Sequence, residues 1–170
     1  MGRGGDRDPP PPLTRLLVPW QYAGPVRGLI LDLKLKAVRA AAEPLVDAMA
    51  AEVWRRGLAG VVLTWVPARP PDNYRRGFDH AALLAQGLAK RLGLPAAPLL
   101  ERRDAALDQA GLGAEDRRRN LEHAFGGRGA SGPVVLVDDV VTTGATLSAC
   151  GRALLGAGAT AVEGVVACTA

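Results

Sequence analysis

Residues 134–150 read VVLVDDVVTTGATLSAC, and this stretch constrains the fold more than any other part of the chain. A run of apolar, mostly β-branched residues ends at Asp138 and Asp139 and predicts a buried strand over 134–138. Threonines and a glycine follow, and they lead directly into a helix that we predict over 146–155. A strand, a tight turn and a helix in this order are typical of a parallel sheet covered by helices.

The rest of the chain repeats this alternation of helical and strand patterns. Hydrophobic periodicity predicts further helices over 38–56, 78–92 and 114–123, and strands over 61–66, 96–100 and 162–168. Such alternation indicates an α/β fold with a mostly parallel sheet. We expect a disordered, Pro/Gly-rich tail over 1–17 and one domain over 18–170, a size that buries a full core.

Composition gives weaker constraints on function. The chain has 21 Lys and Arg against 17 Asp and Glu, a net charge of +4 that suits an anionic partner such as a phosphorylated metabolite or a nucleic acid. No apolar stretch approaches the roughly 20 residues of a membrane span, and the first residues lack the apolar core of a signal peptide. We therefore expect a cytoplasmic protein without a membrane partner. Cys150 and Cys168 form no C-x-x-C motif and are interpreted as buried, reduced thiols.

The stretch after the predicted strand has the chemistry of a phosphate site. Ligands of open α/β sheets bind at the carboxyl ends of the strands, where Asp138 and Asp139 stand. The following turn aims backbone N–H groups and hydroxyls at one point, next to the positive end of a helix dipole. We call residues 141–146 the threonine loop. Its predicted phosphate-binding residues are Val141, Thr142, Thr143, Gly144, Ala145 and Thr146.

Two carboxylates beside a phosphate pocket repel a bare phosphate, so the ligand needs a part that attracts them. A ribose 5-phosphate meets this need, because its phosphate would bind the threonine loop while its 2′ and 3′ hydroxyls donate to Asp138 and Asp139. The same carboxylates would stabilise positive charge that develops on the ring or help to hold Mg²⁺, which we expect as a cofactor.

Three other interpretations compete for these residues. A strand ending in Asp-Asp also resembles a Walker B element, but the chain contains no G-x-x-x-x-G-K-[ST]. GAGATA at 156–161 matches a dinucleotide fingerprint, yet it follows a helix and precedes a strand, which is the reverse of the required order. A purely structural interpretation stays open, with the acids as helix caps and the threonines as turn formers.

The same residues carry a resemblance to a known family. VVLVDDVVTTGAT resembles the phosphoribosyl-pyrophosphate (PRPP) motif of type I phosphoribosyltransferases in order, spacing and residue types. Residues 66–85 and 108–125 resemble the R-G-F and R-x-x-N blocks of the ComF family, and 22–36 is similar to its tyrosine and L-K stretch. The resemblance covers roughly 18–168.

This resemblance implies a fold and an activity. The fold is a single-domain type I phosphoribosyltransferase fold, a mostly parallel sheet flanked by helices with a small N-terminal hood. The activity is Mg²⁺-dependent transfer of a 5-phosphoribosyl group from PRPP to an unidentified acceptor, such as a nucleobase, with release of pyrophosphate. Asp138 and Asp139 would be the catalytic residues, and they are also the possible protein ligands of the metal.

The pyrophosphate site is assigned largely by resemblance. In the superfamily the loop after the first core strand binds pyrophosphate, which gives that role to Ala68, through its backbone, and to Arg69. Lys34 and Lys36 stand two apart on a segment that we expect to be extended, so their side chains would project to one side. The resemblance implies that one of them reaches the diphosphate. Arg76 follows a loop and would close over the site.

The chain also departs from the family pattern. Many members carry an N-terminal zinc ribbon of four cysteines, and a proline-rich tail stands here instead. Asp79-His80 replaces the usual Asn-Gln after R-G-F, Arg69 stands where His is common, and Leu35 and Ala37 replace an aromatic residue and a glycine. These changes leave the acceptor open.

A different class of function remains beside the enzyme. The same fold would serve a non-catalytic PRPP sensor or a DNA-uptake accessory protein, and a homo-oligomer is compatible with either. Arg117, Arg118 and Arg119 are interpreted as a solvated helix face, with contact to single-stranded DNA as the alternative. His80 and His123 lack metal-ligand neighbours at useful spacing and are not assigned a catalytic role.

Overall fold

The computed structural model describes residues 7–68, 77–103 and 123–170, and its centre is a parallel sheet. The strands are β1 (Arg15–Leu17), β2 (Trp20–Gln21), β3 (Val62–Trp65), β6 (Gly132–Val141) and β7 (Ala159–Thr169). They follow the order β1-β7-β6-β3, β2 also pairs with β7, and every one of these pairings is parallel. β6 and β7 are therefore central, and the carboxyl ends of the strands share one edge of the sheet.

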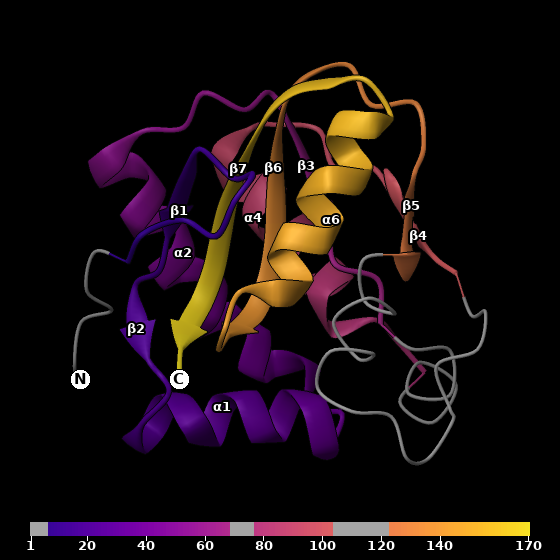
Figure 1. Cartoon of the computed structure of the whole chain (residues 1–170). Helices are drawn as coiled ribbons and strands as arrows, with labels where there is room; N and C mark the ends of the chain where they lie inside the picture. The colour runs from indigo at the N-terminus through magenta and orange to yellow at the C-terminus, as the bar shows by residue number, and fades with distance from the viewer. Residues whose placement is uncertain (1–6, 69–76, 104–122) are drawn as a thin grey trace.

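Helices cover both faces of this sheet (Figure 1). Helices α2 (Ala42–Arg56) and α4 (His80–Leu92) pack on one face, and α6 (Ala145–Gly156) packs on the other. Side chains of β6 alternate between the two cores, with Val135 and Val137 on the α2/α4 side and Val134 and Leu136 on the α6 side. This three-layer arrangement confirms the predicted α/β class.

Helix α1 (Gly24–Leu35) lies across the end of the sheet toward which β6 and β7 point (Figure 1). We expected an extended segment near Lys34, and that expectation is wrong. Pro25 lies in the first turn of the helix, where its missing N–H costs nothing. Val26, Ile30 and Leu33 are then buried at helical spacing, so their packing decides the structure. A short 3₁₀ helix, η1 (Arg39–Ala41), connects α1 to α2.

The chain enters the fold earlier than the predicted tail boundary at residue 17. Residues 15–17 form β1, and Leu13, Leu16 and Leu17 are buried. The Thr14 N–H donates to the Val162 carbonyl at 2.9 Å, next to the β1–β7 pairing. The prolines suggested disorder, but the burial of these three leucines stabilises the ordered conformation of residues 13–17.

The other predicted elements have mixed outcomes. The strands of 134–138 and 162–168 and the helices of 78–92 and 146–155 are confirmed, and Gly93 ends α4 with φ +68°. The strand predicted over 96–100 is wrong, because only Ala96 bridges to β3 and regular pairing starts at Leu100. That pairing joins β4 (Leu100–Arg102) to β5 (Phe125–Gly127) in a separate antiparallel ribbon. The predicted helix 114–123 falls almost wholly outside the described residues.

Two further expectations concern the cysteines and the membrane. Cys150 and Cys168 are both buried and unpaired, as predicted. Burial, followed by the nearby charge of Asp139, raises the pKa of Cys168 to about 12, so the thiol stays protonated at neutral pH. Within the three described ranges, no helix has the length and apolarity that crossing a bilayer requires.

Candidate functional site

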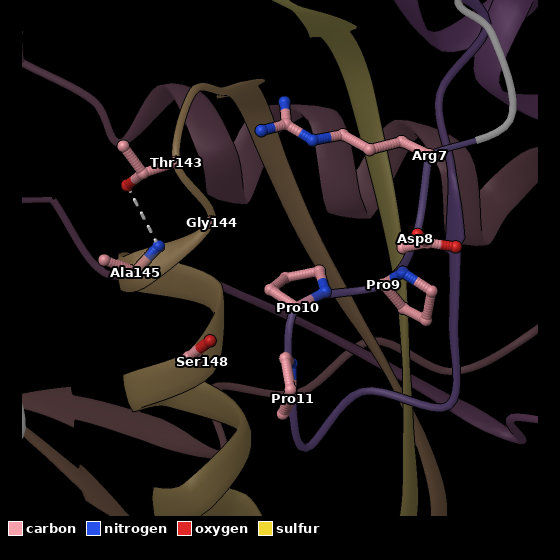
Figure 2. Close-up of a pocket in the computed structure, with 9 residues that line it drawn as sticks. All are labelled: Arg7, Asp8, Pro9, Pro10, Pro11, Thr143, Gly144, Ala145 and Ser148. Atoms are coloured by element: carbon pink, nitrogen blue, oxygen red, sulfur yellow. Dashed lines mark hydrogen bonds between the residues drawn. The ribbon is translucent and has the colours of Figure 1, made fainter.

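The threonine loop joins the end of β6 to the start of α6. Gly144 caps the helix with φ +82°, a left-handed conformation that favours glycine. The Thr143 hydroxyl accepts from the Ala145 N–H at 3.3 Å (Figure 2), while Thr142 and Thr143 are otherwise exposed. A cavity of about 40 Å³ opens in this loop and is lined by Asp138 and by residues 140–147. All six predicted phosphate-binding residues therefore surround one cavity.

Asp138 lies on the α6 side of the sheet, where the alternation of β6 directs it. It is half-buried, and its Oδ1 accepts from the backbone N–H of Asp139 at 2.9 Å. Burial, and secondly the charge of Asp139, raises the pKa of Asp138 well above the ordinary value of an aspartate. A carboxyl group with a raised pKa beside a cavity is a functional-site candidate on physical grounds.

Asp139 lies on the opposite side of the sheet and is only 2% exposed. Its Oδ2 is 2.7 Å from Lys34 Nζ on α1 and 3.3 Å from His80 Nε2 on α4. Asp139 Oδ2 has no hydrogen-bond partner among the described residues, so its contact with Lys34 is an ion pair. The two adjacent aspartates thus differ in environment: Asp138 faces the cavity, and Asp139 faces two basic side chains.

The two lysines that we expected to project to one side pair with different residues. On a helix, residues two apart are separated by about 200° around the axis. Lys34 pairs with Asp139, whereas the largely exposed Lys36 pairs with Asp32 at 2.7 Å. The expected projection of both side chains to one side is wrong, because the segment is helical.

The remaining predicted pyrophosphate residues are only partly described. The Ala68 N–H donates to Asp79 Oδ2 at 3.1 Å, and Asp79 Oδ1 accepts from the N–H groups of Ala81 and Ala82. Asp79 therefore caps α4 and holds the loop after β3 at the same time. Arg69, Arg76 and the three arginines at 117–119 lie outside the described residues.

Sequence reasoning missed the roles of three residues in this region. His80 received no role, because its partner Asp139 is distant in sequence and no local spacing reveals the contact. Arg7 was placed in the tail, yet it donates to Thr169 Oγ1 at 2.7 Å and to the Thr142 carbonyl. A signal for Asp79 was present, since an aspartate directly before a helical period is a typical N-cap.

The described residues bring few metal-ligating side chains together. No group of three or more His, Cys, Asp or Glu gathers among them. Mg²⁺ commonly needs only one or two carboxylates together with oxygens of its ligand. Asp138 fits that pattern because it lines the cavity, and Asp139 fits it poorly because Lys34 occupies its Oδ2.

Replacing Lys34 tests the ion pair. Lys34→Met is expected to lower the free energy of unfolding by about 1–3 kcal/mol, because the buried Asp139 carboxylate loses its nearest cation. A third of the Lys34 side chain is exposed, so the loss stays below that of a fully buried pair. Urea denaturation measures it, and adding Asp139→Asn should restore part of the stability.

Lys36→Met is the matched control for that measurement. Its ammonium is exposed and pairs with Asp32, so we expect a change below about 0.5 kcal/mol. Equal losses for the two lysine variants would contradict a special role for the Lys34–Asp139 pair.

The arrangement of strands and helices matches a known class of structures. The fold resembles glutamine PRPP amidotransferase from B. subtilis, solved in complex with ADP and GMP, with a TM-score of 0.54 and 23% identity. The match covers 76% of this chain and 26% of that one, so this chain spans about a quarter of its length. The mostly parallel sheet with flanking helices is the type I phosphoribosyltransferase fold.

Sequence comparison identifies the family within that class. No family model matches the chain. It is 36% identical over 166 residues to the DNA utilization protein YhgH of Escherichia coli K12, across 91% of this chain and 71% of that protein. Competence protein F of Haemophilus influenzae is 39% identical over 89 residues, across 49% of this chain and 39% of its own. The chain belongs to the YhgH/ComF family.

Proposed function

We propose that the protein binds PRPP and transfers its 5-phosphoribosyl group to a nitrogen nucleophile, with release of pyrophosphate. The observation that carries this proposal is the cavity of the threonine loop, which combines the first amides of α6, threonine hydroxyls and Asp138 at the carboxyl edge of the sheet. This combination suits a ligand with a phosphate at one end and hydroxyls at the other.

The roles follow from the positions of the residues. The threonine loop binds the 5-phosphate, and Asp138 accepts hydrogen bonds from the ribose hydroxyls and stabilises positive charge on the ring. Lys34 pairs with Asp139, whereas Asp138 lines the cavity and is the carboxyl group that would meet the ligand. Asp138 would also hold Mg²⁺ together with ligand oxygens, and a bound metal would offset the charge of the leaving diphosphate.

In the reaction, the bond between ribose C1 and the pyrophosphate oxygen breaks and a bond between C1 and the acceptor nitrogen forms. Pyrophosphate leaves with the electron pair, and the nitrogen loses its proton to water. The protein contributes positioning and electrostatic stabilisation rather than a covalent nucleophile. Ala68, Arg69 and Arg76 are proposed to lie on the pyrophosphate side, and release of the Ala68 N–H from Asp79 would supply one donor.

A pyrophosphate-release assay tests this proposal. Purified protein is incubated with PRPP and Mg²⁺, with and without a panel of nucleobases, and we expect release that requires both protein and an acceptor. Tight PRPP binding without release for any acceptor would favour a PRPP-sensing protein. Absence of both binding and release would reject the proposal.

The names of the relatives support a second candidate, an accessory protein in DNA use. YhgH is named a DNA utilization protein, and the Haemophilus relative is named for competence. Fluorescence anisotropy with single-stranded DNA separates the two candidates. Affinity that falls steeply with salt and is unchanged by Asp138→Asn would favour the accessory role.

A further inference from the structure

Residues 7–13, which we call the N-terminal strap, lie along α6 and reach the threonine loop (Figure 2). The strap is anchored below the loop, where Leu13 is 5% exposed and its N–H donates to the Pro10 carbonyl at 3.0 Å. β1 continues from this anchor. The strap is therefore part of the fold, and Arg7 at its N-terminal side reaches the threonine loop.

Two glycines of the helix region make room for the strap. A Cβ at Gly144 would come within 2.7 Å of Pro10 Cβ, and a Cβ at Gly151 would come within 2.8 Å of Leu13 Cδ1. Both distances are shorter than real Cβ contacts. Gly144 thus has two reasons to lack a side chain: its left-handed backbone and the close approach of Pro10.

Arg7 connects the strap to the loop. One guanidinium nitrogen donates to the Thr142 carbonyl and the other donates to Thr169 Oγ1 at 2.7 Å. Thr142 belongs to the threonine loop and Thr169 ends β7, so Arg7 ties the loop to the neighbouring strand. Figure 2 shows its side chain extending from the strap toward that loop.

The strap does not cover the helix completely. Beside the Pro10–Gly144 contact lies a cavity of about 500 Å³, lined by residues 7–11 of the strap and by Thr143, Gly144, Ala145 and Ser148. The Arg7 contacts lie beyond the Leu13 anchor and outside the buried core. Replacing Arg7 should therefore change the loop without unfolding the domain.

We propose that Arg7 is a positioning residue: it fixes the threonine loop in the arrangement that binds phosphate and adds positive charge beside an anionic ligand. The effect of Arg7 on phosphate binding rests on the proposed function. A loop that is already ordered loses less conformational entropy when a ligand binds, and this preorganisation increases affinity. Hydrogen bonds from a charged donor are strong enough to hold such a loop.

The first arm of the test uses the ligand-free protein. Hydrogen exchange of the Ala145 and Ser148 amides reports on the loop, because they donate to Thr143 Oγ1 and to the Gly144 carbonyl. We expect exchange about tenfold faster in Arg7→Gln, which corresponds to the loss of one charged hydrogen bond. Arg7→Lys should recover part of the protection, because its single ammonium group keeps the charge and can still donate to the Thr142 carbonyl.

Arg15→Gln is the matched control. This substitution removes the same charge from the same end of the chain, but the Arg15 guanidinium contacts the Gly57 carbonyl at 2.9 Å and Glu163 at 3.8 Å, away from the loop. Exchange at Ala145 and Ser148 in this variant should equal that of the wild type. Equal exchange in Arg7→Gln and wild type, or equal acceleration in both variants, would overturn the proposal.

The second arm measures PRPP affinity by calorimetry in Mg²⁺. Arg7→Gln is expected to raise the Kd about tenfold, while Arg15→Gln leaves it unchanged. An unchanged Kd in Arg7→Gln would also overturn the proposal. If the wild type binds no PRPP, the proposed function fails, and the exchange arm still decides whether Arg7 positions the loop.

Discussion

Asp138→Asn is expected to lower the rate of pyrophosphate release by about 10²–10³-fold, the scale of losing one preorganised electrostatic contact. Asparagine keeps the shape of the side chain, and its Oδ1 still accepts from the Asp139 N–H. It removes the ionisable carboxyl group that faces the cavity of the threonine loop. A steady-state assay with PRPP, Mg²⁺ and an acceptor measures the change.

The same variant is expected to be more thermally stable than the wild type at pH 7. Burial, and next the charge of Asp139, raises the folded-state pKa of Asp138. The protonated Asp138 carboxyl group therefore contributes its full stabilisation to the folded state below the unfolded pKa of about 3.9. The folded state loses that stabilisation as the pH rises through the folded pKa. The amide introduced by Asp138→Asn stays neutral at every pH, so the variant avoids that loss, and its melting temperature should approach that of the wild type near pH 3.

Asp32→Asn is the control for both measurements. Asp32 pairs with Lys36 at the surface, so its replacement should change neither the rate nor the pH dependence of stability. An Asp138→Asn variant that keeps full activity, or one that is less stable than the wild type at neutral pH, would contradict the assigned environment of Asp138.

Gly144→Ala is expected to lower the free energy of unfolding by about 2–5 kcal/mol. The left-handed backbone costs a residue with a Cβ about 1–2 kcal/mol, and overpacking against Pro10 adds about 1–3 kcal/mol. The change also displaces the loop beside the phosphate cavity, so PRPP affinity should fall together with stability. Urea denaturation and calorimetry measure the two effects.

Gly129→Ala separates the backbone cost from the clash. Gly129 has φ +52°, and a Cβ there would meet no atom within 4 Å. We expect this variant to lose only the backbone part, about 1 kcal/mol. Equal losses at the two glycines would show that Pro10 does not press against the loop.

The sequence predicted those parts of the site that are continuous in the chain. The strand, the threonine loop and the helix follow each other over 134–156, so local patterns were sufficient to place Asp138 and Gly144 at one cavity. The end of the helix predicted over 78–92 is also correct, because a glycine after a helical period, here Gly93, is a local signal.

The sequence did not predict the contacts made by residues that are distant in the chain. Asp139 and Asp138 looked equivalent, yet the alternation of a buried strand places them on opposite faces, and Asp139 meets Lys34 and His80 from two helices. The strap was missed because its prolines are typical of disorder, whereas its order depends on Leu13 packing beside Gly151.

Calorimetric titration of PRPP into the intact protein in Mg²⁺ tests the central claim, that the threonine loop and Asp138 form a site for a phosphorylated ribose. We predict saturable binding of one PRPP per chain, competition by ribose 5-phosphate, and an affinity at least about tenfold weaker in Gly144→Ala, a difference of about 1.4 kcal/mol. Absence of saturable heat in the folded wild-type protein, or equal affinity in Gly144→Ala, would contradict the account.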